Sequence, residues 1–329
     1  MLAAKFPGGS RIEMVDVPIP KPERDEVLLK VAYCGVCGSE RKVHKNGIDV
    51  IPGHEVSGIV ADANGTHVPE GARIAVYLPV HCGECRFCRS GFTNRCTARD
   101  GLLGWSPPWD GGYAEYMRVP SRNALLLDDA VGLDAGVLLL DTIGTAFHAI
   151  RQASVTQSDR ALVVGCGPLG LGVIAGLKAF GVGEYFATDL YSERLSAAED
   201  LGAVAVPADR AGELENISLI IEVTGRPENI RRSIRQVDSG GKVVLVGEWE
   251  EPWEFDAGGG VILKDFHLIR SWYFPALEFE ENQRMILDGA VDPAKLISHT
   301  FALSDLPAAF ELFLSGASRK ILVGRGNPG

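Results

Sequence analysis

Short apolar runs, some of them alternating with polar positions, fill the first third of the chain between turns marked by glycine and proline. Residues 26–33 and 73–78 are the clearest examples. Both runs are rich in valine, leucine and isoleucine, as half-buried strands usually are. We predict a twisted, largely antiparallel β domain at the start of the chain.

The pattern changes near residue 134, where strands begin to alternate with helices. A helix is predicted over residues 135–151, and a buried strand, a glycine loop and a second helix follow over residues 161–180. The further strand candidates are residues 184–188, 203–206, 219–223 and 242–246. Alternation of strand and helix is typical of a doubly wound α/β domain with a parallel sheet.

The last part of the chain returns to amphipathic helices. Periodic apolar positions predict helices over residues 277–287 and 306–315, followed by a strand over residues 320–323. This tail is expected to rejoin the first domain. The predicted division is therefore residues 1–142, 143–275 and 276–329, with a ligand-binding cleft expected between the two domains.

Composition and charge narrow the choice of partners. The chain has 329 residues, 46% of them hydrophobic, and a formal net charge of −11. This charge disfavours nucleic acid or an anionic membrane as a partner, because phosphate binding needs clustered Lys and Arg. The first residues do not resemble a secretion signal, and no run of about 18 apolar residues follows. We expect a cytoplasmic protein that acts on a small molecule.

Four of the seven cysteines lie within one short segment. They are Cys82, Cys85, Cys88 and Cys96. This spacing allows one loop to wrap a tetrahedral ion, and four thiolates leave zinc no open position for chemistry. We predict a structural zinc site. Free or disulfide-linked cysteines, or a zinc module that binds another macromolecule, are the alternatives.

A glycine-rich loop follows the buried strand near residue 161 and opens a helix. Its glycines match the dinucleotide-binding pattern, in which the first allows a tight turn, the second a close approach to pyrophosphate, and the third helix–strand packing. The helix N-terminus attracts the anion. The predicted contacts are Gly165, Gly167, Pro168, Leu169 and Gly170.

Asp189 ends the next strand, where a dinucleotide site has its acidic residue. Its carboxylate would accept hydrogen bonds from the adenosine ribose and repel a 2′-phosphate, which predicts NAD rather than NADP. Arg194 is a candidate for the adenine side. The alternative is a glycine-rich turn without a ligand and an aspartate that caps a helix.

A second metal site is suggested by Cys37 and His54. A thiolate, an imidazole and one carboxylate would leave the fourth position of a zinc ion for water or substrate, as catalytic sites require. Cys34 is interpreted as a small buried hydrophobic residue.

Taken in order, the segments around Cys37, His54, the four cysteines and Gly165 resemble the zinc-dependent medium-chain alcohol dehydrogenase family, in its polyol, sugar and threonine dehydrogenase branch. The resemblance implies a GroES-like catalytic domain and a Rossmann domain. It also implies that Cys37 and His54 bind the catalytic zinc. The third ligand would be Asp141, where many relatives have Cys or Glu, with Glu55 as the rival.

Further roles follow from the same resemblance. Ser39 would begin the proton relay, but Lys42 stands where many relatives have the histidine that ends it, and His44 lies slightly further along. Thr145 would back the nicotinamide ring. Arg319 or Lys320 near the C-terminus would meet the pyrophosphate or form a solvated basic pair.

Two glycines, Gly225 and Gly247, follow predicted strands and are expected to contact the cofactor through their backbones. Family similarity suggests a homodimer or homotetramer. The resulting hypothesis is an enzyme that moves a hydride between NAD and a secondary alcohol, with two zinc ions per chain. The alternative is a dinucleotide-sensing protein without turnover that keeps only the structural zinc.

Overall fold

The structure, a computed structural model, describes residues 1–248, 252–255 and 258–324. The chain forms two units. The first comprises Met1–Asp141, Phe274–Asp288 and Ile297–Gly329, and the second comprises Thr142–Tyr273 and Gly289–Leu296. Among the described residues, no helix combines the length and apolar content needed to cross a bilayer.

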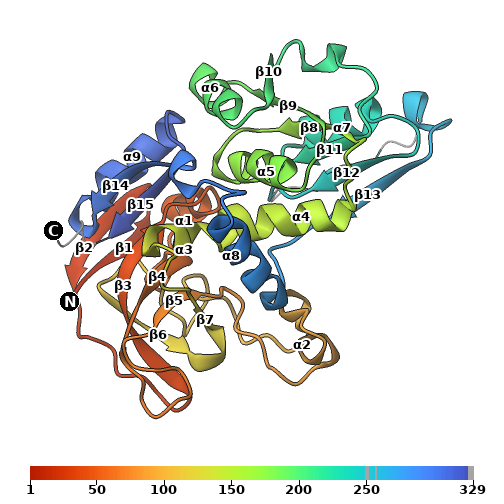
Figure 1. Cartoon of the computed structure of the whole chain (residues 1–329). Coiled ribbons are helices and arrows are strands. Elements are labelled where there is room, and N and C mark those ends of the chain that lie inside the picture. Colours follow the sequence, from red (N-terminus) through yellow and green to blue (C-terminus); the bar gives the residue numbers. More distant parts are fainter. Residues whose placement is uncertain (249–251, 256–257, 325–329) are drawn as a thin grey trace. The chain divides into compact units, whose positions relative to one another are not determined.

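The first unit is built on a mixed, mainly antiparallel sheet. Its strand order is β14 (Ile297–Ala302), β15 (Lys320–Gly324), β3 (Glu26–Gly35), β4 (Glu55–Asp62), β5 (Arg73–Val76) and β7 (Ala124–Leu126), and β6 (Tyr116–Pro120) also pairs with β3. Strands β1 (Leu2–Gly8) and β2 (Arg11–Asp16) form a separate antiparallel pair. Figure 1 shows that the blue strand β15, from the end of the chain, lies among the red strands from its beginning.

The helices of this unit are short. They are α1 (Glu40–Asn46), α2 (Arg86–Arg89), α3 (Leu133–Leu138), α8 (Phe279–Leu287) and α9 (Leu306–Ser315). One apolar core joins the N-terminal strands to the C-terminal helix α9, and Phe6, Tyr113 and Phe310 are among its fully buried rings.

The second unit contains a sheet of six parallel strands. The strand order is β10 (Val204–Pro207), β9 (Glu184–Asp189), β8 (Arg160–Val164), β11 (Leu219–Glu222), β12 (Gly241–Leu245) and β13 (Phe266–Arg270). Its helices are α4 (Ala146–Ala153), α5 (Pro168–Ala179), α6 (Ser192–Asp200) and α7 (Pro227–Gln236). The strand order reverses between β8 and β11, which is where doubly wound sheets bind their ligands. The predicted fold class is confirmed, although β13 was not predicted.

One predicted helix is interrupted. Residues 135–151 were expected to form a continuous helix, but α3 ends at Leu138 and α4 begins only at Ala146, with a π-helical turn over Asp141–Thr145 between them. A π-helical turn is wider than an α-helical turn and is frequent at functional sites. Asp141 is the first residue of this turn.

Candidate metal centres and nucleotide-binding site

Four side chains that suit a metal ion meet in the first unit. Each of Cys37, His54, Glu55 and Asp141 offers one ligand atom, and all four atoms lie within 4.8 Å of one another. Cys37 follows β3, and His54 and Glu55 stand at the start of β4. Gly35 pairs with Glu55, so the antiparallel ladder brings the two segments together.

Burial and the repulsion between negative charges make this cluster of four side chains unfavourable unless a cation binds there. Burial, followed by the charge of Asp141, raises the pKa of Cys37 to about 11. Burial alone would lower the pKa of His54, but the neighbouring Cys37 and Glu40 raise it well above its usual value. A divalent cation would offset these negative charges, and the combination of thiolate, imidazole and carboxylate suits zinc.

Glu55 and Asp141 differ in their partners. Lys320 donates to both carboxylate oxygens of Glu55, at 2.6 and 2.7 Å, and to the carbonyl oxygen of Val36 at 3.2 Å. Asp141 instead accepts a hydrogen bond from the Cys37 thiol at 3.2 Å. Lys320 is 1% exposed, so the expectation of a solvated basic residue or a pyrophosphate contact is wrong for it.

Two residues that the sequence analysis missed complete the surroundings of His54. Oε1 of Glu40 lies 3.2 Å from Nδ1 of His54, and both side chains are almost fully buried. Tyr113 donates a hydrogen bond to Oε2 of the same carboxylate at 2.5 Å. In the sequence, the one feature that could have pointed to Glu40 is its position three residues after Cys37.

The region after Cys37 contains the proton-relay candidates. The Ser39 hydroxyl donates to Sγ of Cys37 at 3.3 Å, and Lys42 is exposed. His44 is buried beside Phe6 and Phe310, with its ring centroid 4.6 Å from that of Phe310. His44 is therefore a packing residue of the apolar core, which disfavours it as the end of a relay.

The four-cysteine segment forms a compact cluster around α2. The ligand atoms of Cys82, Cys85, Cys88 and Cys96 lie within 4.8 Å of one another. Four of the S–S separations within the cluster run from 3.5 to 4.0 Å, which is too long for disulfides. Backbone N–H groups of Cys88 and Thr97 lower the pKa of Cys85 to about 5, and thiolate character favours metal binding.

The glycine loop connects β8 to α5 in the second unit. Gly165 has a φ of +100°, which a residue with a side chain rarely adopts, and a Cβ on Gly170 would overlap the Gly165 carbonyl oxygen. Gly167 caps α5, and Pro168 begins it, followed by Leu169. The loop therefore has the tight turn, followed by a helix N-terminus, that suits a pyrophosphate.

Asp189 lies at the carboxyl end of β9, next to this loop. Its carboxylate accepts hydrogen bonds from the backbone N–H of Cys166 at 2.7 Å and of Tyr191 at 3.0 Å. The guanidinium of Arg194 lies 3.7 Å from Asp189 and over the Tyr191 ring. Arg194 is thus packed against Asp189 instead of extending freely into solvent.

The remaining nucleotide-site candidates lie in the same unit. Gly225 and Gly247 touch each other closely, since a Cβ on either would overlap the backbone around the other. The missed residue Glu222, fully buried at the end of β11, accepts hydrogen bonds from the N–H groups of Thr224 and Gly225 and fixes this turn. Thr145 is buried in the π-helical turn.

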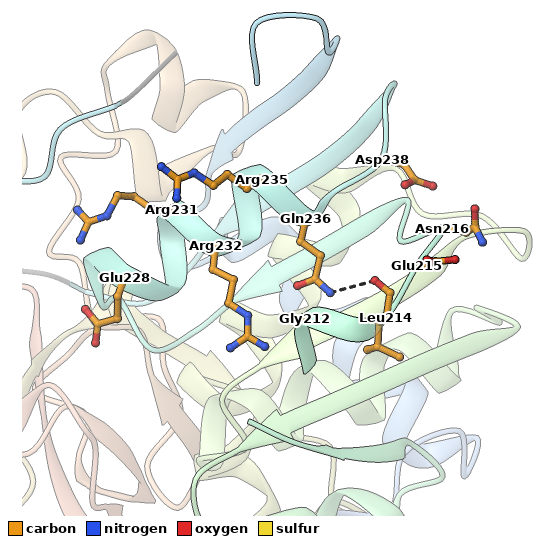
Figure 2. Close-up of a pocket in the computed structure, with 10 residues that line it drawn as sticks. All are labelled: Gly212, Leu214, Glu215, Asn216, Glu228, Arg231, Arg232, Arg235, Gln236 and Asp238. Carbon is orange, nitrogen blue, oxygen red and sulfur yellow. Dashed lines mark hydrogen bonds between the residues drawn. The ribbon is translucent and has the colours of Figure 1, made fainter. Parts of the chain in front are cut away.

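A large surface cavity of about 800 Å³ also lies in the second unit, between α7 and residues 212–216. It contains Arg231, Arg232 and Arg235, but Figure 2 shows Arg232 directed away from the other two, so their guanidinium groups do not converge. Arg232 is also used locally, since it donates to the carbonyl oxygen of Ala208. The three guanidinium groups therefore do not form one anion-binding cluster.

Comparison with known families gives two matches along the chain. Residues 23–129 match the alcohol dehydrogenase GroES-like domain, and residues 168–288 match the zinc-binding dehydrogenase domain. The first match contains Cys37, His54, Glu55 and the four-cysteine segment, and the second begins at Pro168, directly after Gly165 and Gly167. Asp141 lies between the two matches.

Individual relatives align over nearly their whole length. An uncharacterized zinc-type alcohol dehydrogenase-like protein, YphC of Escherichia coli K12, is 30% identical, with 98% of each chain covered. Sorbitol dehydrogenase of Macaca fascicularis is also 30% identical, over 98% of this chain and 94% of that protein. A solved short chain alcohol dehydrogenase, rspB of E. coli CFT073, complexed with NADH, has a TM-score of 0.88 at 28% identity, covering 98% and 99% of the two chains.

Proposed function

Because the chain belongs to the zinc-type alcohol dehydrogenase family, we propose that it oxidises the secondary hydroxyl of a polyol, sugar or amino alcohol, or reduces the matching carbonyl compound. The protein is an oxidoreductase, and its cofactors are zinc and NAD. The observation that carries the proposal is the convergence of Cys37, His54, Glu55 and Asp141 within 4.8 Å. The sensing alternative has no comparable support, because it leaves this cluster without a role.

We assign the catalytic zinc to Cys37, His54 and Asp141. Glu55 is the weaker candidate because Lys320 occupies both of its carboxylate oxygens. Three protein ligands leave one position for the substrate hydroxyl. The other zinc ion would be structural and held by the cysteines at positions 82, 85, 88 and 96.

When bound, zinc supplies a Lewis acid and NAD supplies the hydride acceptor. The residues of the chain perform the remaining tasks. Glu40 orients His54 through Nδ1. Ser39, whose Oγ lies 3.3 Å from Sγ of Cys37, receives the proton from the substrate hydroxyl and passes it towards solvent. Thr145 would support the nicotinamide ring.

Cofactor binding is assigned to the glycine loop and its surroundings. The N–H groups at the start of α5 bind the pyrophosphate, with Gly165, Gly167 and Gly170 leaving room for it. Asp189 accepts hydrogen bonds from the ribose and disfavours a 2′-phosphate. The further assigned contacts are Pro168, Leu169, Arg194, Gly225 and Gly247.

The domain roles, assembly and location complete the proposal. Residues 1–142 and 276–329 would form the catalytic domain, and residues 143–275 the NAD-binding domain. Within the described part of the sheet, β13 pairs only with β12, so its other edge is available for a second subunit. This supports a homodimer or homotetramer. Cysteine ligands need a reducing compartment, which favours the cytoplasm.

The direct test is NAD reduction by the purified protein across a panel of polyols, sugars and amino alcohols, with NADP in parallel and zinc measured in the same sample. The proposal expects turnover with at least one secondary alcohol, faster with NAD. Turnover that persists after complete removal of zinc would contradict it, as would catalytic efficiency with NADP equal to that with NAD.

A further inference from the structure

Tyr113 is a buried tyrosine outside the ligand set whose hydroxyl reaches the carboxylate beside His54. Its side chain has no exposed surface, and it donates a hydrogen bond to Oε2 of Glu40 at 2.5 Å. Oε1 of Glu40 lies 3.2 Å from Nδ1 of His54. Tyr113, Glu40 and His54 therefore form a buried row that leads to the metal site.

The two oxygens of Glu40 have different surroundings. Oε2 accepts hydrogen bonds from the Tyr113 hydroxyl and from the N–H of Cys37 at 3.2 Å. Oε1 is fully buried and lies 3.2 Å from Nδ1 of His54, and neither of these two atoms has another hydrogen-bond partner among the described residues. Because two donors hold Oε2, the carboxylate cannot rotate about its last carbon–carbon bond without losing them. Oε1 therefore remains directed at Nδ1 of His54.

Tyr113 is itself rigidly held. Its N–H donates to the carbonyl oxygen of Pro52 at 3.0 Å, its carbonyl oxygen accepts from Ala4 at 2.8 Å, and its ring stacks on Phe6. A Cβ on Gly53, which precedes His54 and has a φ of +102°, would lie 2.8 Å from the Tyr113 nitrogen. The tyrosine thus packs directly against the backbone that carries His54 and also holds the carboxylate that faces the imidazole ring.

We propose that Tyr113 is a positioning residue for the catalytic metal: its hydroxyl fixes Glu40, and Glu40 fixes the orientation of His54. A carboxylate that accepts from the remote nitrogen of a ligand histidine fixes the tautomer and the direction of the ligating nitrogen. The inference rests on the proposed function, because it requires that His54 bind a metal ion. Removal of such a partner lowers metal affinity about 10- to 100-fold.

The test is Tyr113→Phe in the full-length protein, with cobalt(II) titrated into the metal-free form and thiolate-to-cobalt absorption as the readout. Cys37→Ser identifies the part of the signal that belongs to the catalytic site. We expect Tyr113→Phe to weaken cobalt binding there about 10- to 100-fold and to leave the four-cysteine site unchanged. Tyr116→Phe is the matched control, since Tyr116 is three residues further on and lines a separate cavity with Met1 and Phe6.

A double-variant cycle tests whether Tyr113 acts on metal binding through Glu40. In a Glu40→Gln background, which has already lost the charged carboxylate, Tyr113→Phe is expected to change cobalt affinity much less than it does in the wild type. Tyr113→Phe with wild-type affinity at the catalytic site overturns the inference, as does an equal loss at both metal sites. A wild-type protein that binds cobalt only at the four cysteines overturns the proposed function and this inference with it.

Discussion

Lys320 and Glu55 form a buried ion pair behind the proposed catalytic metal, with Nζ at 2.6 Å from one carboxylate oxygen and 2.7 Å from the other. Their side chains are 2% and 0% exposed. Lys320 belongs to the last strand, β15, and Glu55 to β4, so the pair ties the end of the chain to the metal-binding segment. The pair bears on the ligand assignment, because Lys320 occupies both carboxylate oxygens of Glu55.

Loss of Lys320 should destabilise the protein strongly. Lys320→Met leaves the Glu55 carboxylate buried without its counterion, which usually costs about 3–5 kcal/mol. Denaturant unfolding with zinc present should show this loss in the free energy of unfolding. The double variant Lys320→Met with Glu55→Gln should recover part of it, because no unpaired charge remains. A single variant within about 0.5 kcal/mol of the wild type, as at an ordinary surface position, would disagree with the buried pair.

The two carboxylates should differ in their effect on zinc content. Asp141→Asn removes a charged ligand, so dialysis against a moderate chelator should strip the catalytic zinc and leave the four-cysteine zinc in place. Glu55→Gln should keep both ions under the same conditions. Zinc content is measured by elemental analysis. Loss of the catalytic zinc from Glu55→Gln and its retention in Asp141→Asn would make Glu55 the third ligand.

Ser39 should matter for turnover and not for cofactor binding. Ser39→Ala removes the hydroxyl that begins the proton path, and kcat is expected to fall about a hundredfold while the NAD dissociation constant stays the same. Ser39→Thr keeps a hydroxyl and should recover part of the rate. An alanine variant with undiminished kcat would remove Ser39 from the mechanism.

His44 should produce a pH-dependent loss of stability. Burial lowers its pKa below the usual value, despite an opposing backbone hydrogen bond with Ser10. The unfolded chain therefore binds more protons than the folded protein as the pH falls below about 6.5, and stability declines by at most about 1.4 kcal/mol per pH unit from this group. Its contribution is fully present above that pH.

The variant His44→Leu should unfold with a shallower dependence on pH between about 6.5 and 5, since it lacks the titrating ring. The matched control is His67→Leu, at an exposed position. The free energy of unfolding is measured with denaturant at each pH. If it depends on pH equally in the wild type and in His44→Leu, the His44 ring is protonated as readily in the folded protein as in the unfolded one.

The elements that could be predicted from the sequence are those with a local signal. The strand, glycine loop and helix around Gly165 are contiguous in the chain, and the alternation that follows them fixes a parallel sheet. Strand β13 was missed, as was the π-helical turn that begins at Asp141. Their formation depends on packing against distant segments and is not encoded in a repeating apolar pattern.

The surroundings of the metal site show the same limit. Cys37 and His54 were candidates because of the family pattern in the segments around them, since neither residue alone indicates a metal site. Glu40, Tyr113 and Lys320 come from three distant segments, and each is an ordinary residue in its own sequence context. The pairing of β15 with β3 and of β3 with β4 brings the lysine to the metal-binding segment, and no local pattern in the sequence indicates this pairing.

The zinc content of the wild type and of Cys37→Ser, measured after exhaustive dialysis, tests the central claim most directly. If Cys37 and His54 hold a metal ion separate from the four-cysteine site, the wild type should retain two zinc ions per chain and the variant one, with NAD still bound by both. Equal zinc content in the two proteins would contradict the account, since Cys37 would then have no part in binding metal.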